Sequence, residues 1–256
     1  MTKPSPERLF VVALLSGVSL AFLAIGTAES RRSLVPAPAP IQVPNYRRTL
    51  SPNFNRKAFF DEVRDTVFQG SLSQTQVDGL NFLLDVWQQH YASLPDTFLA
   101  YALGTVKTET SSFLPTDEGG GDAYLFRMYD PCGPNRANAI EHGNKTCGDG
   151  VKYRGRGYVQ LTWKNNYREM SRVVGVDLVS NPELAKVPDY AAKILFTGMT
   201  QGLFTGVGLP KYLNASGSDW YNARRVVNGT DRAGIIARDA QAFHRAIRRA
   251  GAETLV

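Results

Sequence analysis

The sequence contains few of the residues from which metal and redox centres are built. Among its 256 residues are only two cysteines and three histidines, and their spacing matches no recognised metal-binding motif. We therefore expect neither a metal site nor a cofactor. Cys132 and Cys147 bracket a loop rich in Gly, Asn and Pro. Such a pair is usually bridged in an oxidising compartment and free in the cytosol, so the two are a disulfide candidate with both states open.

A long run of charge of one sign is also missing. The formal net charge of +6 and the pI of about 9.3 favour anionic partners such as nucleic acid, a membrane surface or an acidic cell wall. The basic residues are nevertheless spread along the chain, and only Arg245, Arg248 and Arg249 cluster. No nucleic-acid-binding motif accompanies them, so no nucleic-acid partner is expected. Gly155-Arg-Gly157 is too short to be a nucleotide-binding glycine motif.

The N-terminal segment, residues 1–28, has the pattern of a targeting sequence. Lys3 and Arg8 precede a mostly apolar run from Leu9 to Ala28, which is long enough to cross a bilayer as a hydrophobic helix. Small residues before position 29 also suit a signal peptidase. A cleaved signal peptide and a signal-anchor transmembrane helix over residues 9–28 are both open. In either case we expect export to the periplasm or the cell exterior, with attachment to the inner membrane if the segment is kept.

A proline-rich stretch separates this segment from the rest. Residues 29–50 include Val-Pro-Ala-Pro-Ala-Pro and predict an extended linker. The remaining residues, 51–256, are enough for one catalytic domain with a full core, which we expect to be monomeric.

Apolar residues that recur at helical spacing predict a mainly helical domain. Ser73 is a plausible N-cap, and Gly70 separates two helical patterns. The predicted helices lie within residues 56–91 (two helices), 95–109, 164–175, 188–203 and 231–250. Residues between 110 and 150 predict a long functional loop. Alternation in Tyr158-Val-Gln-Leu-Thr-Trp163 predicts an extended segment, with Gln160 and Thr162 on one face and Trp163 in the core.

Two glutamates lie nine positions apart, Glu109 at the end of a predicted helix and Glu118 before three glycines. Cleavage of a glycosidic bond needs one carboxyl that donates a proton and one that activates water. Glu109 lies on the apolar stripe of its helix, where lost hydration favours the neutral form and suits an acid. Glu118 is expected in a wetter loop, where a carboxylate stays charged and suits a base. From spacing alone, both could also be solvated surface residues.

The residues around these glutamates resemble family 19 glycoside hydrolases, the chitinases and the related bacterial and phage endolysins. Glu109-Thr, the second glutamate at 118, and the run from Gly148 to Tyr167, GDGVKYRGRGYVQLTWKNNY, carry the resemblance. Phe204-Thr-Gly206 and Asn222–Gly229 are similar to the bacterial and phage branch. The resemblance covers residues 56–248 and implies a lysozyme-like helical fold with a small extended segment lining a cleft.

The resemblance also implies roles for individual residues. Glu109 stands at the general acid and Glu118 at the general base of an inverting mechanism, which needs carboxyls about 6.5 to 9.5 Å apart. Thr162 stands where a hydroxyl holds the attacking water. Substrate contacts are implied at Gln160, Asn166 and Asn228, and among the aromatic residues we expect Tyr153 and Tyr129 to stack on sugars.

The predicted activity is hydrolysis of β-1,4 bonds in N-acetylhexosamine polymers. Export and basic charge favour peptidoglycan as the polysaccharide partner, and chitin is the alternative. Lys107, two residues before the acid, departs from the family pattern, and its charge would weaken the acid. An inactive glycan-binding protein is therefore a second alternative. A membrane-tethered structural protein is a third, because of the N-terminal segment and linker.

Overall fold

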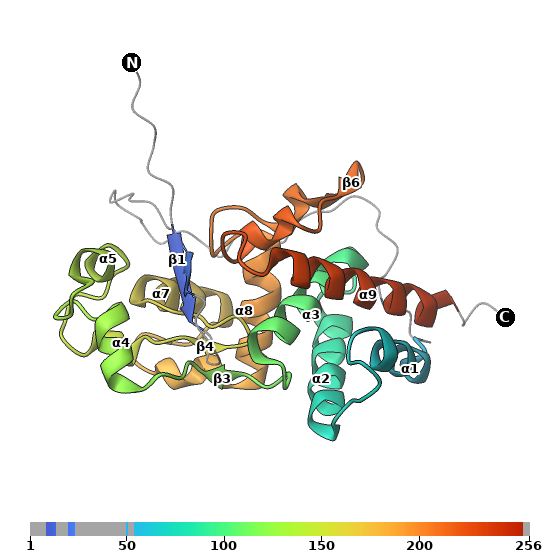
Figure 1. The fold of residues 1–256 in the computed structure, drawn as a ribbon, viewed down its shortest axis with the longest axis horizontal. Coiled ribbons are helices and arrows are strands. Elements are labelled where there is room, and N and C mark those ends of the chain that lie inside the picture. Colours follow the sequence, from blue (N-terminus) through green and yellow to red (C-terminus); the bar gives the residue numbers. More distant parts are fainter. Residues whose placement is uncertain (1–8, 14–19, 24–49, 51–53, 253–256) are drawn as a thin grey trace, which may run out of the picture. The chain divides into compact units, whose positions relative to one another are not determined.

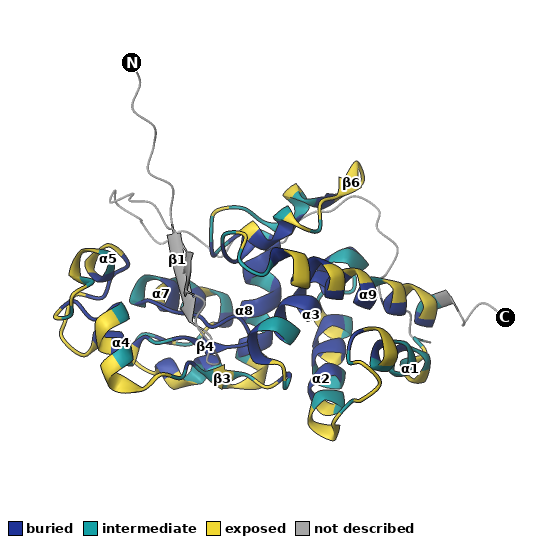
Figure 2. Cartoon of the chain, viewed as in Figure 1, coloured by how far each residue is buried: buried dark blue, intermediate teal, exposed yellow. Residues whose placement is uncertain are grey.

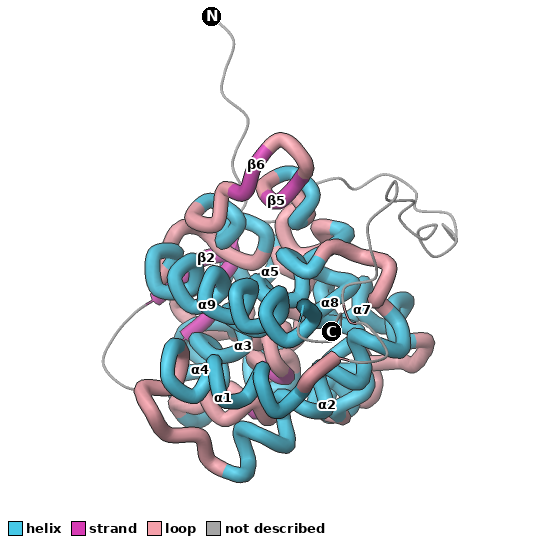
Figure 3. The backbone as a smooth tube through the Cα atoms, turned by 90° about the vertical axis from the view of Figure 1, so that its right-hand side faces the viewer, coloured by secondary structure: helices cyan, strands magenta, loops and turns pink. Residues whose placement is uncertain are grey.

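The structure, a computed structural model, describes residues 9–13, 20–23, 50 and 54–252. Within residues 54–252, helices dominate and strands are few and short, which confirms the predicted mainly helical class (Figure 3). These residues form two compact units. We call residues 54–114, 209–224 and 232–252 unit II, and residues 115–208 and 225–231 unit I. Each is described by itself.

The predicted N-terminal helix is wrong for the part of that segment which the structure describes. Two strands, β1 (Leu9–Ala13) and β2 (Leu20–Leu23), pair antiparallel there. Leu-Phe-Val-Val-Ala contains adjacent β-branched residues, and pairing of two short apolar strands satisfies backbone groups that a helix would satisfy internally. The rest of the predicted targeting segment and linker lies outside the described residues, apart from a buried Leu50. Of the helices that the structure describes, none has the length and apolar character needed to span a membrane.

Unit II is a cluster of helices. They are α1 (Arg56–Thr66), α2 (Gln74–His90), α3 (Asp96–Thr110) and α9 (Ala233–Ala252). The predicted cap is confirmed, because Ser73 and Gln76 form a capping box that satisfies backbone groups at the start of α2. Helices α3 and α1 both pack against α9 (Figure 1). Unit II also contains η2 (Leu209–Lys211) and a hairpin of the strands β5 (Leu213–Asn214) and β6 (Gly217–Ser218).

Helix α3 lies at the centre of unit II. Every residue from Phe98 to Val106 is buried, so this helix has no solvated face over its middle turns (Figure 2). Gly104 permits the close approach of α9, since a Cβ at this position would lie 2.9 Å from the backbone nitrogen of Ala240. The buried surroundings of α3 therefore extend to the residues at its C-terminal end.

Unit I contains the remaining helices and one short sheet. Strand β3 (Thr116–Asp117) pairs antiparallel with β4 (Arg156–Gly157). The helices are α4 (Gly121–Tyr129), α5 (Arg136–Glu141), α6 (Asp149–Lys152), α7 (Lys164–Val174), η1 (Pro182–Lys186) and α8 (Pro188–Gln201). Helix η3 (Asn222–Val226) begins in unit II and ends in unit I. Helices α4 and α6 pack together, as do α7 and α8.

Two predictions for unit I are wrong. The expected loop between residues 110 and 150 contains the short helices α4, α5 and α6. Gly120 and Gly148, which precede α4 and α6, have left-handed backbone. The expected alternating segment is a turn: Gln160 and Trp163 have positive φ angles of 52° and 78°, and Arg156 and Leu161 exchange backbone hydrogen bonds. All residues from Tyr158 to Trp163 are buried, so there is no polar face.

Candidate functional site

Glu109 lies in the last turn of α3 and is buried, as predicted from its position on the apolar stripe. Its Oε1 accepts a hydrogen bond of 2.8 Å from Nη2 of Arg224. The two side chains are only 1% and 2% exposed. Oε2 of Glu109 has no hydrogen-bond partner among the described residues. One carboxylate oxygen is thus fixed by a guanidinium, and the other is a buried acceptor that no described residue uses.

Lys107 does not place an uncompensated charge beside the acid. Its Nζ lies 2.6 Å from Oδ2 of Asp239 on α9, and the Asp239 side chain is 2% exposed. Arg238 contacts the other oxygen of the same carboxylate at 3.0 Å. Because the Lys107 charge is compensated by Asp239, the departure from the family pattern does not by itself argue for an inactive site.

Glu118 follows β3 and is held at both oxygens within unit I. Tyr129 donates its hydroxyl to Oε1 at 2.7 Å, and the backbone N–H of Gly155 donates to Oε2 at 2.9 Å. The N–H of Glu118 donates in turn to the carbonyl of Gly155 at 2.8 Å. A Cβ at Gly155 would lie 2.9 Å from Oε2, so only glycine allows this approach without displacement. Two donors on one carboxylate favour its ionised form.

The wetter loop predicted around Glu118 is not present. Its side chain is buried, with 7% of the residue exposed. The β3–β4 pairing and the contact with Gly155 enclose it, and neither can be read from a glycine-rich sequence. Charge on Glu118 is therefore supported by hydrogen bonds rather than by water.

A network of ion pairs fixes the strand that carries Glu118. Asp117, the preceding residue, contacts Arg154, Arg156 and Lys186. Glu183 joins the same three cations. Buried Arg156 is the central member, with 1% of its side chain exposed. The network joins β3, β4 and η1, so it limits movement of the backbone at Glu118.

The predicted polar residues of the Gln160 region lie close together. A Cβ at Gly155 would come within 3.0 Å of Oε1 of Gln160, which places this amide beside Glu118. The hydroxyl of Thr162 donates to the carbonyl of Gln160 at 2.9 Å, and Asn166 donates to the carbonyl of Thr162 at 2.7 Å. All three side chains are buried and in unit I. Their roles toward water and sugar stay predictions.

Tyr129 and Tyr153 have no ring face open to a sugar. Tyr129 is 0% and Tyr153 1% exposed. The hydroxyl of Tyr153 donates to the carbonyl of Val179 at 3.1 Å, and the ammonium groups of Lys152 and Lys164 each lie 5.2 Å from its ring centroid. The stacking roles that we predicted for them are therefore replaced by packing, and for Tyr129 by the contact with Glu118.

Asn228 lies in the segment of unit I that follows η3. It is buried, its Oδ1 accepts from the N–H of Gly229 at 2.7 Å, and its Nδ2 has no hydrogen-bond partner among the described residues. A buried amide with an unused donor is consistent with the predicted substrate contact, which stays a prediction.

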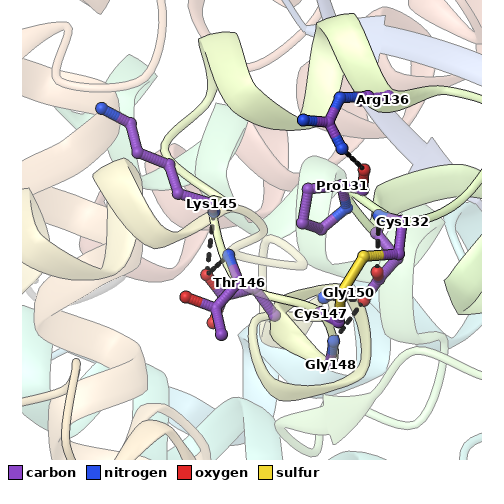
Figure 4. Close-up of a disulfide and its surroundings, with 10 residues drawn as sticks. Pro131, Cys132, Arg136, Lys145, Thr146, Cys147, Gly148 and Gly150 are labelled. Carbon is purple, nitrogen blue, oxygen red and sulfur yellow. Dashed lines mark hydrogen bonds between the residues drawn. A yellow bond between two sulfur atoms is a disulfide. The ribbon is translucent and has the colours of Figure 1, made fainter.

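The cysteine pair is bridged. Cys132 and Cys147 form a disulfide with their Cα atoms 5.4 Å apart (Figure 4). Asp130 lies beside the bridge and accepts hydrogen bonds from the N–H groups of Cys132, Gly148 and Gly150. One buried carboxylate thus holds both ends of the bridged loop. Within residues 54–252, the only group with metal-ligand proximity is Asp130 with these two sulfurs, and disulfide sulfurs are not thiolate ligands.

Two functional contacts escaped prediction from the sequence. Arg224 belongs to the Asn222–Gly229 motif, but the sequence does not indicate which of two adjacent arginines reaches Glu109. Tyr129 lies eleven residues after Glu118, and its hydroxyl could be assigned only after α4 was recognised as a helix.

Comparison with known proteins finds one family that the centre of the chain matches. Residues 99–201 match the family Chitinase class I, glycoside hydrolase family 19. Endochitinase A2 of Pisum sativum is 34% identical over 89 residues, which are 34% of this chain and 26% of the pea protein. An inactive chitinase-like protein 1 of Hevea brasiliensis is 42% identical over 53 residues, 20% of this chain and 17% of that protein. The matched part thus spans well under two thirds of these relatives.

The fold has a solved counterpart. Chitinase C from Streptomyces griseus superposes with a TM-score of 0.51 and 18% identity, over 80% of this chain and 96% of that one. At this identity the match shows the fold alone. It confirms the helical architecture that the sequence resemblance implied.

Proposed function

We propose, from the match of residues 99–201 to glycoside hydrolase family 19, that this protein hydrolyses β-1,4 bonds of an N-acetylhexosamine polymer by an inverting mechanism. The observation that carries the proposal is the contrast between its two glutamates. Glu109 keeps one oxygen without a partner in a buried site, whereas Glu118 has a donor on each oxygen. Burial of Glu109 suits a carboxyl that gives away a proton, although the Arg224 guanidinium at Oε1 favours its ionised form, and the two donors on Glu118 suit a carboxylate that stays ionised.

Glu109 serves as the general acid in this proposal. Arg224 fixes Oε1, so the side chain keeps one orientation and Oε2 carries the proton to the leaving oxygen of the sugar. After bond cleavage the carboxylate is negative, and the adjacent guanidinium stabilises that charge. No metal or cofactor is required for this step.

Glu118 serves as the general base. Its oxygens accept hydrogen bonds from the hydroxyl of Tyr129 and from the N–H of Gly155. The ionised carboxylate accepts the proton of the attacking water, and the hydroxyl of Thr162 orients the water. Gln160, Asn166 and Asn228 supply amide groups for the N-acetyl and hydroxyl groups of the sugar.

Chitin is the substrate that we propose. Charge and expected export favoured peptidoglycan in the sequence, but both properties describe delivery rather than recognition. The pea relative is named an endochitinase, and the structural counterpart is a chitinase. These names outweigh the charge argument, and peptidoglycan becomes the alternative. Export, and retention of the N-terminal segment as an anchor, stay proposals that rest on residues 1–28 of the sequence.

Product release from the two polymers tests this choice. Purified protein should release reducing ends from colloidal chitin and fewer from purified peptidoglycan. Glu109→Gln should lower the rate on chitin by about 10²- to 10⁴-fold, the range for loss of a positioned acid. Faster release from peptidoglycan than from chitin would reverse the assignment of substrate. Equal rates for wild type and Glu109→Gln would refute the acid.

A glycan-binding protein without activity is the second candidate. It is favoured by the similarity to an inactive chitinase-like protein. The contact between Lys107 and Asp239 removes the main sequence argument for it. Sedimentation with chitin without any new reducing ends, for wild type and Glu109→Gln alike, would support this candidate.

A further inference from the structure

We propose that Tyr129 is a positioning residue for Glu118: its hydroxyl holds one carboxylate oxygen and keeps the side chain ionised and oriented for its reaction. This inference rests on the proposed function, in which Glu118 is the general base. The hydroxyl of Tyr129 contacts the carboxylate of Glu118, so a role in sugar stacking or in packing alone does not account for it. It lies 2.7 Å from Oε1 and points away from solvent.

The carboxylate is held between two elements of unit I. Tyr129 approaches Oε1 from α4, and the N–H of Gly155 approaches Oε2 from the turn before β4. Because the donors engage different oxygens, they restrain rotation of the carboxylate as well as its charge. Loss of the hydroxyl would leave one oxygen of a buried carboxylate without this donor, which is costly only while the group is ionised.

The hydroxyl can act only as a donor to this carboxylate. Tyr129 is fully buried, and burial, followed by the charge of Glu118, raises its pKa well above the ordinary value of 10.0. The phenol therefore keeps its proton throughout any working pH range. A carboxylate can only accept, so the proton of the hydroxyl lies between the two oxygens.

The ring is fixed by its neighbours. Trp163 contacts it edge to face, with centroids 4.9 Å apart and planes at 83°. His142 stacks on this indole, with ring centroids 4.7 Å apart. The carbonyl of Tyr129 accepts from Nδ2 of Asn144 at 2.9 Å. These contacts place the hydroxyl before a substrate arrives, which is the property that a positioning group needs.

Two further ionisable groups act near Glu118. Tyr124, also on α4, has a pKa that is raised by burial and then by the charge of Glu118. Asp117 precedes Glu118, and its carboxylate contacts Arg154, Arg156 and Lys186. Tyr124 also contacts Tyr129, with ring centroids 6.4 Å apart, so Tyr129→Phe changes one neighbour of Tyr124 as well as the contact with Glu118.

The test is Tyr129→Phe, which removes the hydroxyl and keeps the ring. Tyr158→Phe is the matched control, because Tyr158 is a buried tyrosine of the same unit that lies outside the proposed site. The titration of the Glu118 carboxyl is followed by NMR on protein labelled with ¹³C at the glutamate carboxyl, with Glu118→Gln identifying the resonance. The midpoint should rise by about one unit or more in Tyr129→Phe, the shift that corresponds to loss of a hydrogen bond to a charged group. It should not move in Tyr158→Phe.

Kinetics provide the second measurement. The acidic limb of kcat/KM on an N-acetylglucosamine oligomer should move to higher pH by the same amount in Tyr129→Phe, since this limb reports the base of the free enzyme. An unchanged midpoint in Tyr129→Phe overturns the inference. A shifted midpoint in a protein whose wild type cleaves no polymer supports the contact and refutes the proposed function instead.

The contact can also be measured without changing Tyr129. In wild-type protein its hydroxyl proton should exchange slowly with solvent and resonate far downfield, and the signal should be lost in Glu118→Gln. Absence of any such signal from folded wild type would overturn the inference even if Tyr129→Phe does not fold.

Discussion

Replacement of Arg224 by alanine tests the burial of the proposed acid. Nη2 of Arg224 and Oε1 of Glu109 are 2.8 Å apart, and the side chains are 2% and 1% exposed. Without the guanidinium, the carboxylate would remain buried with its main opposite charge removed. Loss of one partner from a buried ion pair costs about 3 to 5 kcal/mol of unfolding free energy. For a protein of this size the melting temperature should fall by roughly 6 to 20 °C.

The matched control is Arg248→Ala in the same unit. Arg248 lies 3.7 Å from Asp96, and 72% of its side chain is exposed. Solvent screens such a pair, so its loss should cost less than about 1 kcal/mol. In a Glu109→Gln background, Arg224→Ala should cost less than in wild type, because the remaining amide is neutral. The difference between the two costs is the coupling energy of the pair.

Urea unfolding followed by circular dichroism measures all four variants. The expected order of destabilisation is Arg224→Ala well above Arg248→Ala, with coupling to Glu109 of at least about 1 kcal/mol. If Arg224→Ala costs no more than Arg248→Ala, or shows no coupling to position 109, the argument from burial is refuted.

Three further predictions concern the scaffold. The Cys132→Ser/Cys147→Ser double variant should lose about 3 kcal/mol in urea unfolding, because the bridge closes a loop with a sequence separation of 15; wild type in reducing buffer should behave like it, and equal stability would contradict the prediction. Gly104→Ala should lower the free energy of unfolding by about 1 to 3 kcal/mol, because its Cβ would lie 2.9 Å from the backbone of Ala240. Gly234→Ala, with open space around it, should be neutral or stabilising. A lower melting temperature for Gly234→Ala than for Gly104→Ala would contradict this. Partial burial raises the pKa of Glu183, but hydrogen bonds from Lys186 and Arg156 outweigh it and lower the pKa from 4.5 to about 2. Its stabilising contribution is therefore present above pH 4.5 and lost as the pH falls toward 2, so acid unfolding of Glu183→Gln should depend less on pH in this range, and parallel curves would refute it.

The long helices were predictable because local and tertiary preferences agree there. Ser73 precedes a strong apolar period and has Gln76 three residues later, so the capping box found in the structure is encoded locally. Burial of Glu109 followed in the same way from its place on the stripe of α3. Family resemblance then supplied the roles, which no periodicity contains.

The short elements of unit I were not predictable by the same means. Helices α4, α5 and α6 have nine, six and four residues, too few for an apolar period to be distinguished from a glycine-rich loop. The alternation around Gln160 suggested a strand, but positive φ at Gln160 and Trp163 turns the chain back on itself. Such backbone angles are imposed by packing, because β-branched and large residues rarely adopt them alone.

The decisive contacts of the site join residues that are distant in sequence. Glu109 and Arg224 are 115 positions apart, and Lys107 and Asp239 are 132 apart. Only the folded chain shows that the first pair orients the proposed acid and that the second compensates the lysine beside it. Both pairings therefore determine the charges around Glu109.

The stereochemistry of the first product tests the central claim most directly. Wild-type protein is mixed with a soluble N-acetylglucosamine oligomer, and proton NMR spectra are recorded before mutarotation equilibrates the new reducing ends. An inverting mechanism that uses Glu109 as acid and Glu118 as base predicts that the α-anomer appears first, and that Glu118→Gln releases almost none. Initial appearance of the β-anomer, or undiminished release by Glu118→Gln, would contradict the account.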